Sequence, residues 1–178
     1  VFNKRIYTVV ATLIQKNYAD YQQGQQTAQS DFFANVVTEF TDQIRINFGG
    51  RWNSHSNYGS HFTYSLNPSI QIFDKNQNSL KFQAAYSTAF IAPSLYQLFD
   101  PFSGNLDLQP EENTSFEIGL VYKLKKWELS GTYFNRIESP SLIYDLATYR
   151  YENATDQARY YGVEAVLSGS IGSKLMLD

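Results

Sequence analysis

Aromatic side chains in two polar segments are the residues of this chain best suited to binding chemistry. Flat rings pack on large organic ligands, and the hydroxyl of a tyrosine keeps one edge polar. Six such rings lie in the segments 91–113 and 138–158: Tyr96, Phe99, Phe102, Tyr144, Tyr149 and Tyr151. We take these six as candidate ligand-binding residues of two loops. Packing of the loops on themselves is the alternative interpretation.

Metal binding has weaker support. The first segment carries the acidic residues Asp100, Asp107, Glu111 and Glu112. Ca²⁺ takes several oxygen ligands, but this spacing matches no calcium loop, so a solvated loop is favoured. His55 and His61 are not accompanied by a third ligand, which favours structural positions over a metal or acid–base pair. We predict neither a metal site nor a cofactor.

Catalysis and nucleic-acid binding are also disfavoured. The sequence offers neither a Ser-His-Asp set nor a phosphate-binding glycine loop, so no nucleophile or base has a partner and we predict that the chain is not an enzyme. Cysteine is absent, which excludes disulfides and thiolate metal sites. The formal charge of −3 gives no basic patch for nucleic acid.

Hydrophobic residues at every second position predict the elements that hold these loops. In the segment 43–53, Ile44, Ile46, Phe48 and Trp52 alternate with polar residues such as Arg45 and Arg51. Alternation of this kind indicates a β-strand with one apolar and one hydrophilic face. The same pattern recurs at 62–72, 79–87, 114–123, 127–133 and 161–168. It is weaker at 32–40, the segment 6–14 is apolar on both faces, and a ninth strand begins at 174–178.

The lengths of the strands and connections predict a membrane barrel. The strands run to about ten residues, the length of a tilted strand that crosses a bilayer. The connections alternate between short (41–42, 74–78, 124–126, 172–173) and long (16–31, 54–60, 91–113, 138–158). An outer-membrane barrel has short turns at one rim and long loops at the other, with apolar residues facing lipid. We therefore predict an all-β, antiparallel transmembrane β-barrel.

The barrel prediction also assigns positions to the charged and aromatic residues of the strands. The residues expected to point into the lumen are Arg45, Arg51, Lys81, Glu117, Glu128 and Glu164. Those expected to form interfacial girdles are Trp52, Tyr86, Trp127 and Tyr133. These patterns leave two other interpretations open: a small complete barrel that serves as an adhesin or structural anchor, and a soluble β-sandwich that binds a ligand.

One segment resembles a known family. Phe90, Pro93, Ser94 and Leu95 are followed by Gly104-Asn105, Leu108 and Pro110-Glu111, a pattern similar to the C-terminal barrel portion of TonB-dependent outer-membrane receptors. Later segments with the same resemblance, in the same order, are 133–136, 143–145, 149–153 and 162–164. Segments 96–99 and 144–149 are most similar to the cobalamin (vitamin B12) receptor subgroup. Leu106 departs from the family pattern, which has proline there.

This resemblance implies a fold, a function and partners. It implies that residues 1–178 are a partial barrel of eight or nine strands from a barrel of about 22, with the N-terminal plug domain outside this sequence. The function implied is import of a bulky nutrient, cobalamin or an iron–siderophore, through the outer membrane of a Gram-negative bacterium. The partners implied are the TonB–ExbB–ExbD complex, acting through the plug, outer-membrane lipid and, as a further candidate, a surface lipoprotein.

Overall fold

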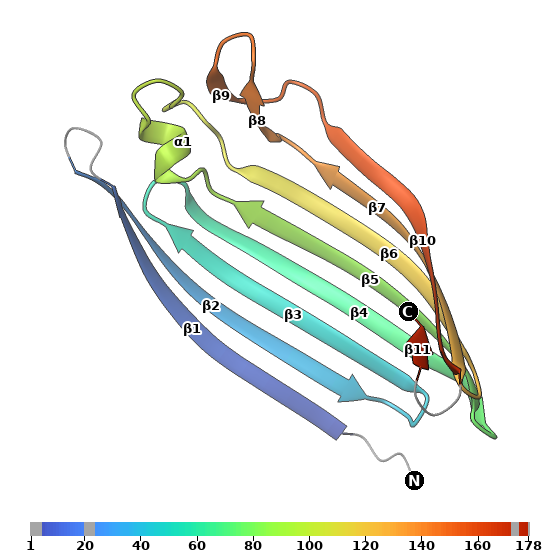
Figure 1. The fold of residues 1–178 in the computed structure, drawn as a ribbon. Helices are drawn as coiled ribbons and strands as arrows, with labels where there is room; N and C mark the ends of the chain where they lie inside the picture. The colour runs from blue at the N-terminus through green and yellow to red at the C-terminus, as the bar shows by residue number, and fades with distance from the viewer. Residues whose placement is uncertain (1–4, 20–23, 172–174, 178) are drawn as a thin grey trace.

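The computed structural model describes residues 5–19, 24–171 and 175–177 and contains one large antiparallel sheet. Its strand order is β1-β2-β3-β4-β5-β6-β7-β10-β11 (Figure 1). The strands are β1 (Arg5–Ala19), β2 (Gln25–Glu39), β3 (Ile44–His55), β4 (Gly59–Lys75), β5 (Asn78–Ile91), β6 (Glu111–Leu124), β7 (Trp127–Glu138), β10 (Ala158–Ile171) and β11 (Leu175–Leu177). A short helix, α1 (Leu95–Phe99), follows β5, and a separate hairpin of β8 (Leu142–Asp145) and β9 (Arg150–Asn153) follows β7. The prediction of eight long antiparallel strands and the start of a ninth is confirmed.

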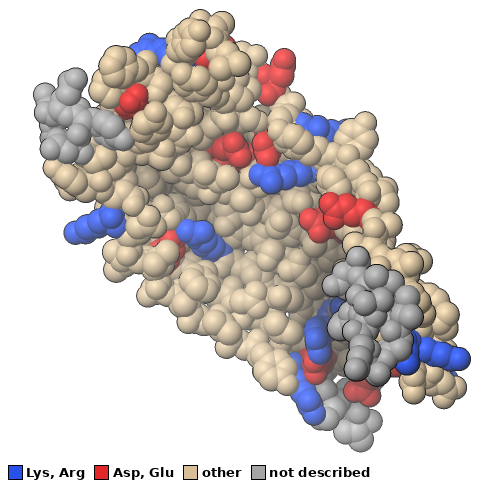
Figure 2. Space-filling model, viewed as in Figure 1, with Lys and Arg blue, Asp and Glu red and all other residues tan. Residues whose placement is uncertain are grey.

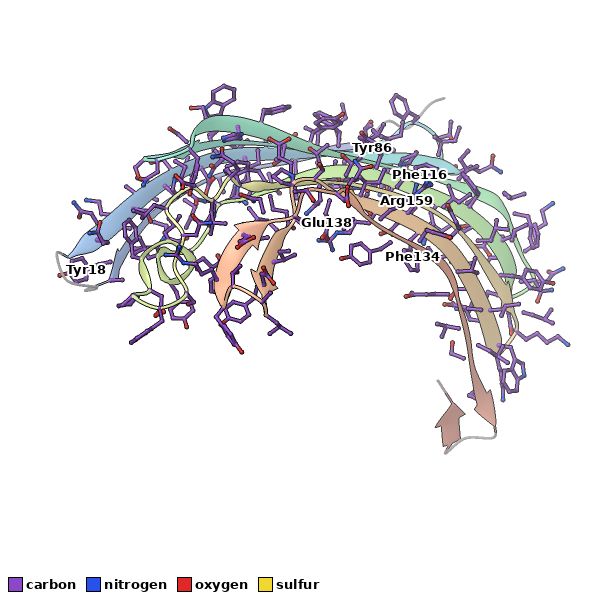
Figure 3. All side chains as sticks on the ribbon, turned by 90° about the horizontal axis from the view of Figure 1, so that it is seen from above. Tyr18, Tyr86, Phe116, Phe134, Glu138 and Arg159 are labelled. Carbon is purple, nitrogen blue, oxygen red and sulfur yellow. The ribbon has the colours of Figure 1, made fainter. Side chains whose placement is uncertain are left out.

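The sheet is curved like the wall of a barrel, and its two faces differ in chemistry. Figure 3 shows the arch from above, with Phe134 pointing into the concave side. On the convex side, apolar residues of neighbouring strands lie opposite one another: Trp52 pairs with Phe62, and Tyr86 pairs with Phe116. Residues directly opposite in an antiparallel ladder share a face, so the apolar rows of successive strands form one continuous surface.

Little of this apolar surface is covered by protein. The buried apolar side chains of the described residues are Leu95, Leu98 and Leu108, which all belong to the connection between β5 and β6. Large apolar residues of the strands are instead exposed, among them Leu120 at 50%. The packed core of this structure therefore lies in the loops, and the sheet presents its apolar side outward, as a wall that faces lipid does.

The charged residues expected in the lumen lie on the concave side. Arg45, Arg51 and Lys81 lie opposite Ser69, Thr63 and Gln71 in the ladders. Glu117, Glu128 and Glu164 occupy the same side of β6, β7 and β10, as their partners Phe134, Lys123 and Thr132 show. The predicted assignment of polar residues to the inner face is confirmed.

Two connections that we expected to be long are short. The ladder of β1 and β2 continues to the pair Ala19 and Gln25, and that of β3 and β4 continues to His55 and Gly59. The alternation of apolar and polar residues fades there because a strand that extends beyond the membrane has water on both sides, whereas its backbone hydrogen bonds continue. The long connections 92–110 and 139–157 are confirmed, as are the tight turns at 41–42, 76–77 and 125–126. The turn expected at 172–173 lies outside the described residues.

One strand departs from regular pairing. Pro68 lies inside β4, and the register of β4 against β5 shifts between Gln71 and Phe73. Proline has no N–H to donate to a ladder, which fits the gap in the pairs between β4 and β5 at residues 67–68. The Gln71 side chain donates from Nε2 to the carbonyls of Phe73 and Leu80 and so bridges the two strands at the bulge.

No helix among residues 5–19, 24–171 and 175–177 has the length and apolarity needed to cross a membrane.

Candidate functional site

Two long loops lie over the concave side at one end of the sheet. The first long loop (residues 92–110) joins β5 to β6 and contains α1, and the second long loop (residues 139–157) joins β7 to β10 and contains the β8–β9 hairpin. Figures 1 and 3 show both at the end opposite the tight turns, folded inward under the arch. In a closed barrel this place is the mouth.

The first long loop is fixed by local hydrogen bonds. Ser94 caps α1: the Gln97 N–H donates to Ser94 Oγ at 3.2 Å, and the Ser94 N–H donates to Gln97 Oε1 at 2.8 Å. Ser94 and Gln97 thus form a capping box, which satisfies backbone donors that a helix start leaves free. After the helix, the Gly104 N–H donates to the Asp100 carbonyl at 2.9 Å, and the Ser103 hydroxyl donates to Asp100 Oδ2 at 3.0 Å. This short helix and turn hold the loop in one conformation.

A small hydrophobic core supports the same loop. Leu95, Leu98 and Leu108 are 8%, 4% and 1% exposed. The Tyr58 hydroxyl, from the turn between β3 and β4, donates to the Leu108 carbonyl at 3.1 Å. Burial raises the pKa of Tyr58 above its usual value of 10.0, so its hydroxyl stays a donor at neutral pH. The core and this bond join the first long loop to the neighbouring strand ends.

The two long loops are joined by backbone and amide hydrogen bonds. The Gln109 N–H donates to Asn153 Oδ1 at 2.7 Å, and Asn153 Nδ2 donates back to the Gln109 carbonyl at 2.9 Å. The Tyr151 N–H donates to the Ser103 carbonyl at 3.0 Å, and Asn105 Nδ2 donates to the Tyr151 carbonyl at 2.9 Å. Paired bonds of this kind restrict both loops, which therefore form a single unit.

The loop unit brings three of the six candidate rings together. Tyr151 makes edge-to-face contacts with Tyr96, at 6.0 Å between centroids, and with Tyr144, at 5.1 Å. Tyr96 and Tyr144 are about half exposed, so each ring offers surface to a ligand. We call Tyr96, Tyr144 and Tyr151 the tyrosine cluster. Edge-to-face packing fixes the orientation of such rings.

The other three candidates do not join this cluster. Phe102 is 88% exposed and Tyr149 is 67% exposed. Phe99 ends α1 and is half-buried. Phe102 and Tyr149 are nevertheless accessible to a large ligand above the mouth.

The concave wall below the loops is hollowed and polar. A hollow of about 630 Å³ is lined by residues that include Glu117, Phe134, Arg136, Glu138 and Tyr160. Arg136 pairs with Glu138 at 2.6 Å between Nη2 and Oε1. Figure 2 shows this side of the molecule, with Lys and Arg lying beside Asp and Glu in the hollowed region.

A second ion pair lies near the top of β2 and β3. Arg51 donates from Nε and Nη2 to the two carboxylate oxygens of Asp31 at 3.0 and 2.8 Å. Asp31 is buried, and Asn53 and Gln29 also donate to it. Bidentate pairing to a buried carboxylate neutralises Arg51 and orients it.

Sequence reasoning missed Tyr58, Asp31, Gln109 and Asn153. Each acts through partners that are distant in the chain, such as Gln109 and Asn153. Residue spacing along the sequence cannot identify such a pair, because the pairing of the strands, not the local sequence, brings the two loops together.

The histidines have structural surroundings. His61 stacks on Phe90 with 3.6 Å between centroids and bonds through Nε2 to the Tyr58 carbonyl, and His55 accepts the Asn57 N–H through Nδ1. Within the described part of the chain, no group of three or more His, Asp or Glu side chains is placed to hold a metal ion.

Replacing Asn153 is expected to separate the two loops. Asn153→Ala removes both amide bonds to Gln109, and a lost hydrogen bond of this kind costs about 1 kcal/mol. Hydrogen exchange in the full-length protein will therefore be faster in residues 92–110, although alanine lies in the other loop. Asn78→Ala, which removes a hydrogen bond from the Lys125 N–H in the tight turns at the opposite rim, is the control and should leave this exchange unchanged. Equal exchange in both variants contradicts the coupling of the loops.

The bond from Tyr58 predicts a response to alkaline pH. Because the folded-state pKa of Tyr58 is raised above 10.0, its stabilising contribution is complete below pH 10 and is lost as the pH rises through the higher folded value. Exchange of amides in residues 92–110 should then accelerate at alkaline pH beyond the intrinsic chemical rate. Tyr58→Phe should show fast exchange already at neutral pH and lack the alkaline change. An alkaline change that persists in Tyr58→Phe assigns it to another group.

Comparisons with known proteins agree with this architecture. The family model described as TonB dependent receptor-like, beta-barrel matches residues 3–177. The vitamin B12 transporter BtuB of Vibrio cholerae is 31% identical over 134 residues, which cover 74% of this chain and 21% of that protein. An iron-regulated outer membrane virulence protein of the same species is 30% identical over 167 residues, with 77% of this chain and 24% of that protein covered.

A solved structure shows the same fold. The siderophore receptor PirA of Pseudomonas aeruginosa superposes with a TM-score of 0.82 at 21% identity, over 99% of this chain and 35% of that one. The chain thus spans between a fifth and about a third of the proteins it is similar to. The predicted resemblance is confirmed: this chain belongs to the TonB-dependent receptor family and forms part of its β-barrel.

Proposed function

We propose that this chain is a sector of a receptor that imports a bulky nutrient through the outer membrane of a Gram-negative bacterium. The observation that carries the proposal is the arrangement of the wall: an exposed apolar convex face, a polar hollowed concave face, and two long loops that both lie at the same rim. A wall with these three properties separates lipid from an aqueous lumen and presents loops to the outside.

The loops supply the capture surface in this proposal. The tyrosine cluster is preassembled, so little conformational entropy is lost when a flat or ring-rich ligand binds to it. Phe102 and Tyr149 extend the surface outward, and Phe99 supports it from the end of α1. The six rings Tyr96, Phe99, Phe102, Tyr144, Tyr149 and Tyr151 are the proposed ligand-contacting residues.

Cobalamin is the first candidate nutrient and an iron–siderophore the second. Relatives named for vitamin B12 transport and for iron regulation both share about 30% identity with this chain. Transport through a wide barrel requires a plug, which we place in another part of the protein. The plug would be moved by the inner-membrane TonB–ExbB–ExbD complex, with outer-membrane lipid around the barrel and a surface lipoprotein as a further candidate partner. The proposed role is binding and transport, without catalysis.

A transport assay tests this function. The full-length receptor is expressed in a strain that lacks its own cobalamin and siderophore receptors, and uptake of labelled cobalamin or ferric siderophore is measured with and without TonB. We expect uptake of one ligand class that disappears without TonB. Membrane insertion without uptake or binding of either class would contradict the proposal and would favour a structural anchor.

A further inference from the structure

We propose that this sector of the mouth selects a metal chelate with no net negative charge. The inference rests on the proposed import function and narrows its ligand class. Ferric complexes of three catecholates are trianionic, whereas ferric trihydroxamates and cobalamins are neutral or cationic. The charges of the loops and of the wall below them favour the neutral and cationic chelates over the trianionic ones.

The loops carry many more carboxylates than cations. Within the two long loops, the acidic residues are Asp100, Asp107, Asp145, Glu152 and Asp156, and Arg150 is the cation. Arg150 lies directly opposite Asp145 in the β8–β9 ladder. It also occupies the other face of the hairpin from Tyr144 and Tyr151, which pair with each other one position further along. The cation is therefore placed beside a carboxylate and away from the tyrosine cluster.

Two arginines on the concave wall are neutralised, Arg136 in the hollow below the loops and Arg51 near the top of β2 and β3. Arg136 pairs with Glu138, and Arg51 pairs with the buried carboxylate of Asp31. Glu117 adds a further carboxylate to the same hollow as Arg136. An anionic chelate entering here would have to compete with carboxylates that already hold these guanidinium groups, at a cost in desolvation and repulsion.

The tyrosine cluster also favours neutral or cationic ligands over anionic ones, for a separate physical reason. The face of an aromatic ring carries the negative end of its quadrupole and attracts cations. Tyr96 and Tyr144 are about half exposed. Ring faces and carboxylates thus favour the same ligands: flat or ring-rich chelates that are neutral or positive.

Binding by the full-length receptor tests the inference with three probes. These are cyanocobalamin, a cationic ferric trihydroxamate and a trianionic ferric tricatecholate, each titrated calorimetrically at low and at physiological salt. We expect one of the first two to bind at least about tenfold more tightly than the tricatecholate at low salt, with the difference reduced as salt screens it. Cyanocobalamin and the trihydroxamate distinguish a corrinoid from an iron chelate.

A charge reversal tests the same point on a matched pair of residues. Asp107 lies in the first long loop and Asp42 in a tight turn at the opposite rim, and neither side chain makes a hydrogen bond within the described residues. Asp107→Lys should strengthen tricatecholate binding and weaken binding of the cationic chelate by about severalfold at low salt. Asp42→Lys makes the same change of charge far from the mouth and should alter neither.

The outcomes separate this inference from the proposed function. If the tricatecholate binds most tightly, the charge inference is wrong while import of a nutrient stands. Equal effects of Asp107→Lys and Asp42→Lys would also overturn it. If the receptor binds none of the three probes, the proposed function fails and the inference falls with it.

Discussion

Arginine in place of Leu120 is expected to destabilise the barrel by about 2–4 kcal/mol, the cost of an arginine at the lipid-facing midplane of a barrel wall. Leu120 lies in the middle of the convex row of β6, between Ile118 and Tyr122, and is 50% exposed. Its cross-strand neighbours are Phe82 and Gly131. On a water-facing sheet the same substitution would cost little, because the guanidinium would be solvated.

Ser130 provides the matched control. It lies on the concave side of β7, opposite Val121 and Val166, at a similar height on the wall. Ser130→Arg should cost much less than Leu120→Arg when unfolding free energies of the full-length receptor are measured by denaturant titration in lipid vesicles. Equal costs for the two variants, or a larger cost for Ser130→Arg, would mean that the convex side is not the lipid side.

Alanine at position 104 is expected to disrupt the first long loop. A Cβ added to Gly104 would lie 2.6 and 2.7 Å from the backbone O and N of Asp100, and 2.8 Å from the Leu98 carbonyl oxygen. These neighbours are backbone atoms, so the turn after α1 must open, at a cost of about 1–3 kcal/mol. Opening this turn shifts Ser103 and Asn105, which hold Tyr151.

The expected result of Gly104→Ala is a loss of ligand affinity of about tenfold, the factor that corresponds to about 1.4 kcal/mol. Calorimetric titration of the full-length receptor with its transported ligand measures it. Gly131→Ala is the control, because a Cβ there meets no atom nearer than 4.0 Å. Unchanged affinity in Gly104→Ala, with the variant folded, would show that the loop unit does not position the binding surface.

The strands of this fold could be predicted because a lipid-facing wall imposes a strict pattern on the sequence. Residues such as Phe116, Ile118, Leu120 and Tyr122 must be apolar because they face hydrocarbon, while their neighbours meet water. The pattern ends where the membrane ends. This explains why the extension of β1 to Ala19 and of β3 to His55 was missed, and why two connections expected to be long are short.

The candidate site could be predicted only as a set of residue types in two loops. The rings that face one another were fixed by contacts between segments about 50 residues apart, such as Tyr96 and Tyr151. Helix α1 was also missed, although its start carries the Ser94 and Gln97 capping box. A five-residue helix gives too short a window for a helical period to show.

The most direct test of the lipid-facing wall uses spin labels on consecutive residues of β6 in the full-length receptor, reconstituted in lipid vesicles. Accessibility to oxygen, which concentrates in hydrocarbon, is compared with accessibility to a water-soluble nickel chelate at residues 115–122. The structure predicts a period of two: Phe116, Ile118, Leu120 and Tyr122 accessible to oxygen, and Ser115, Glu117, Gly119 and Val121 accessible to the nickel chelate or protected from both reagents. Equal accessibility of the two sets, or the opposite alternation, would contradict a membrane-spanning barrel wall.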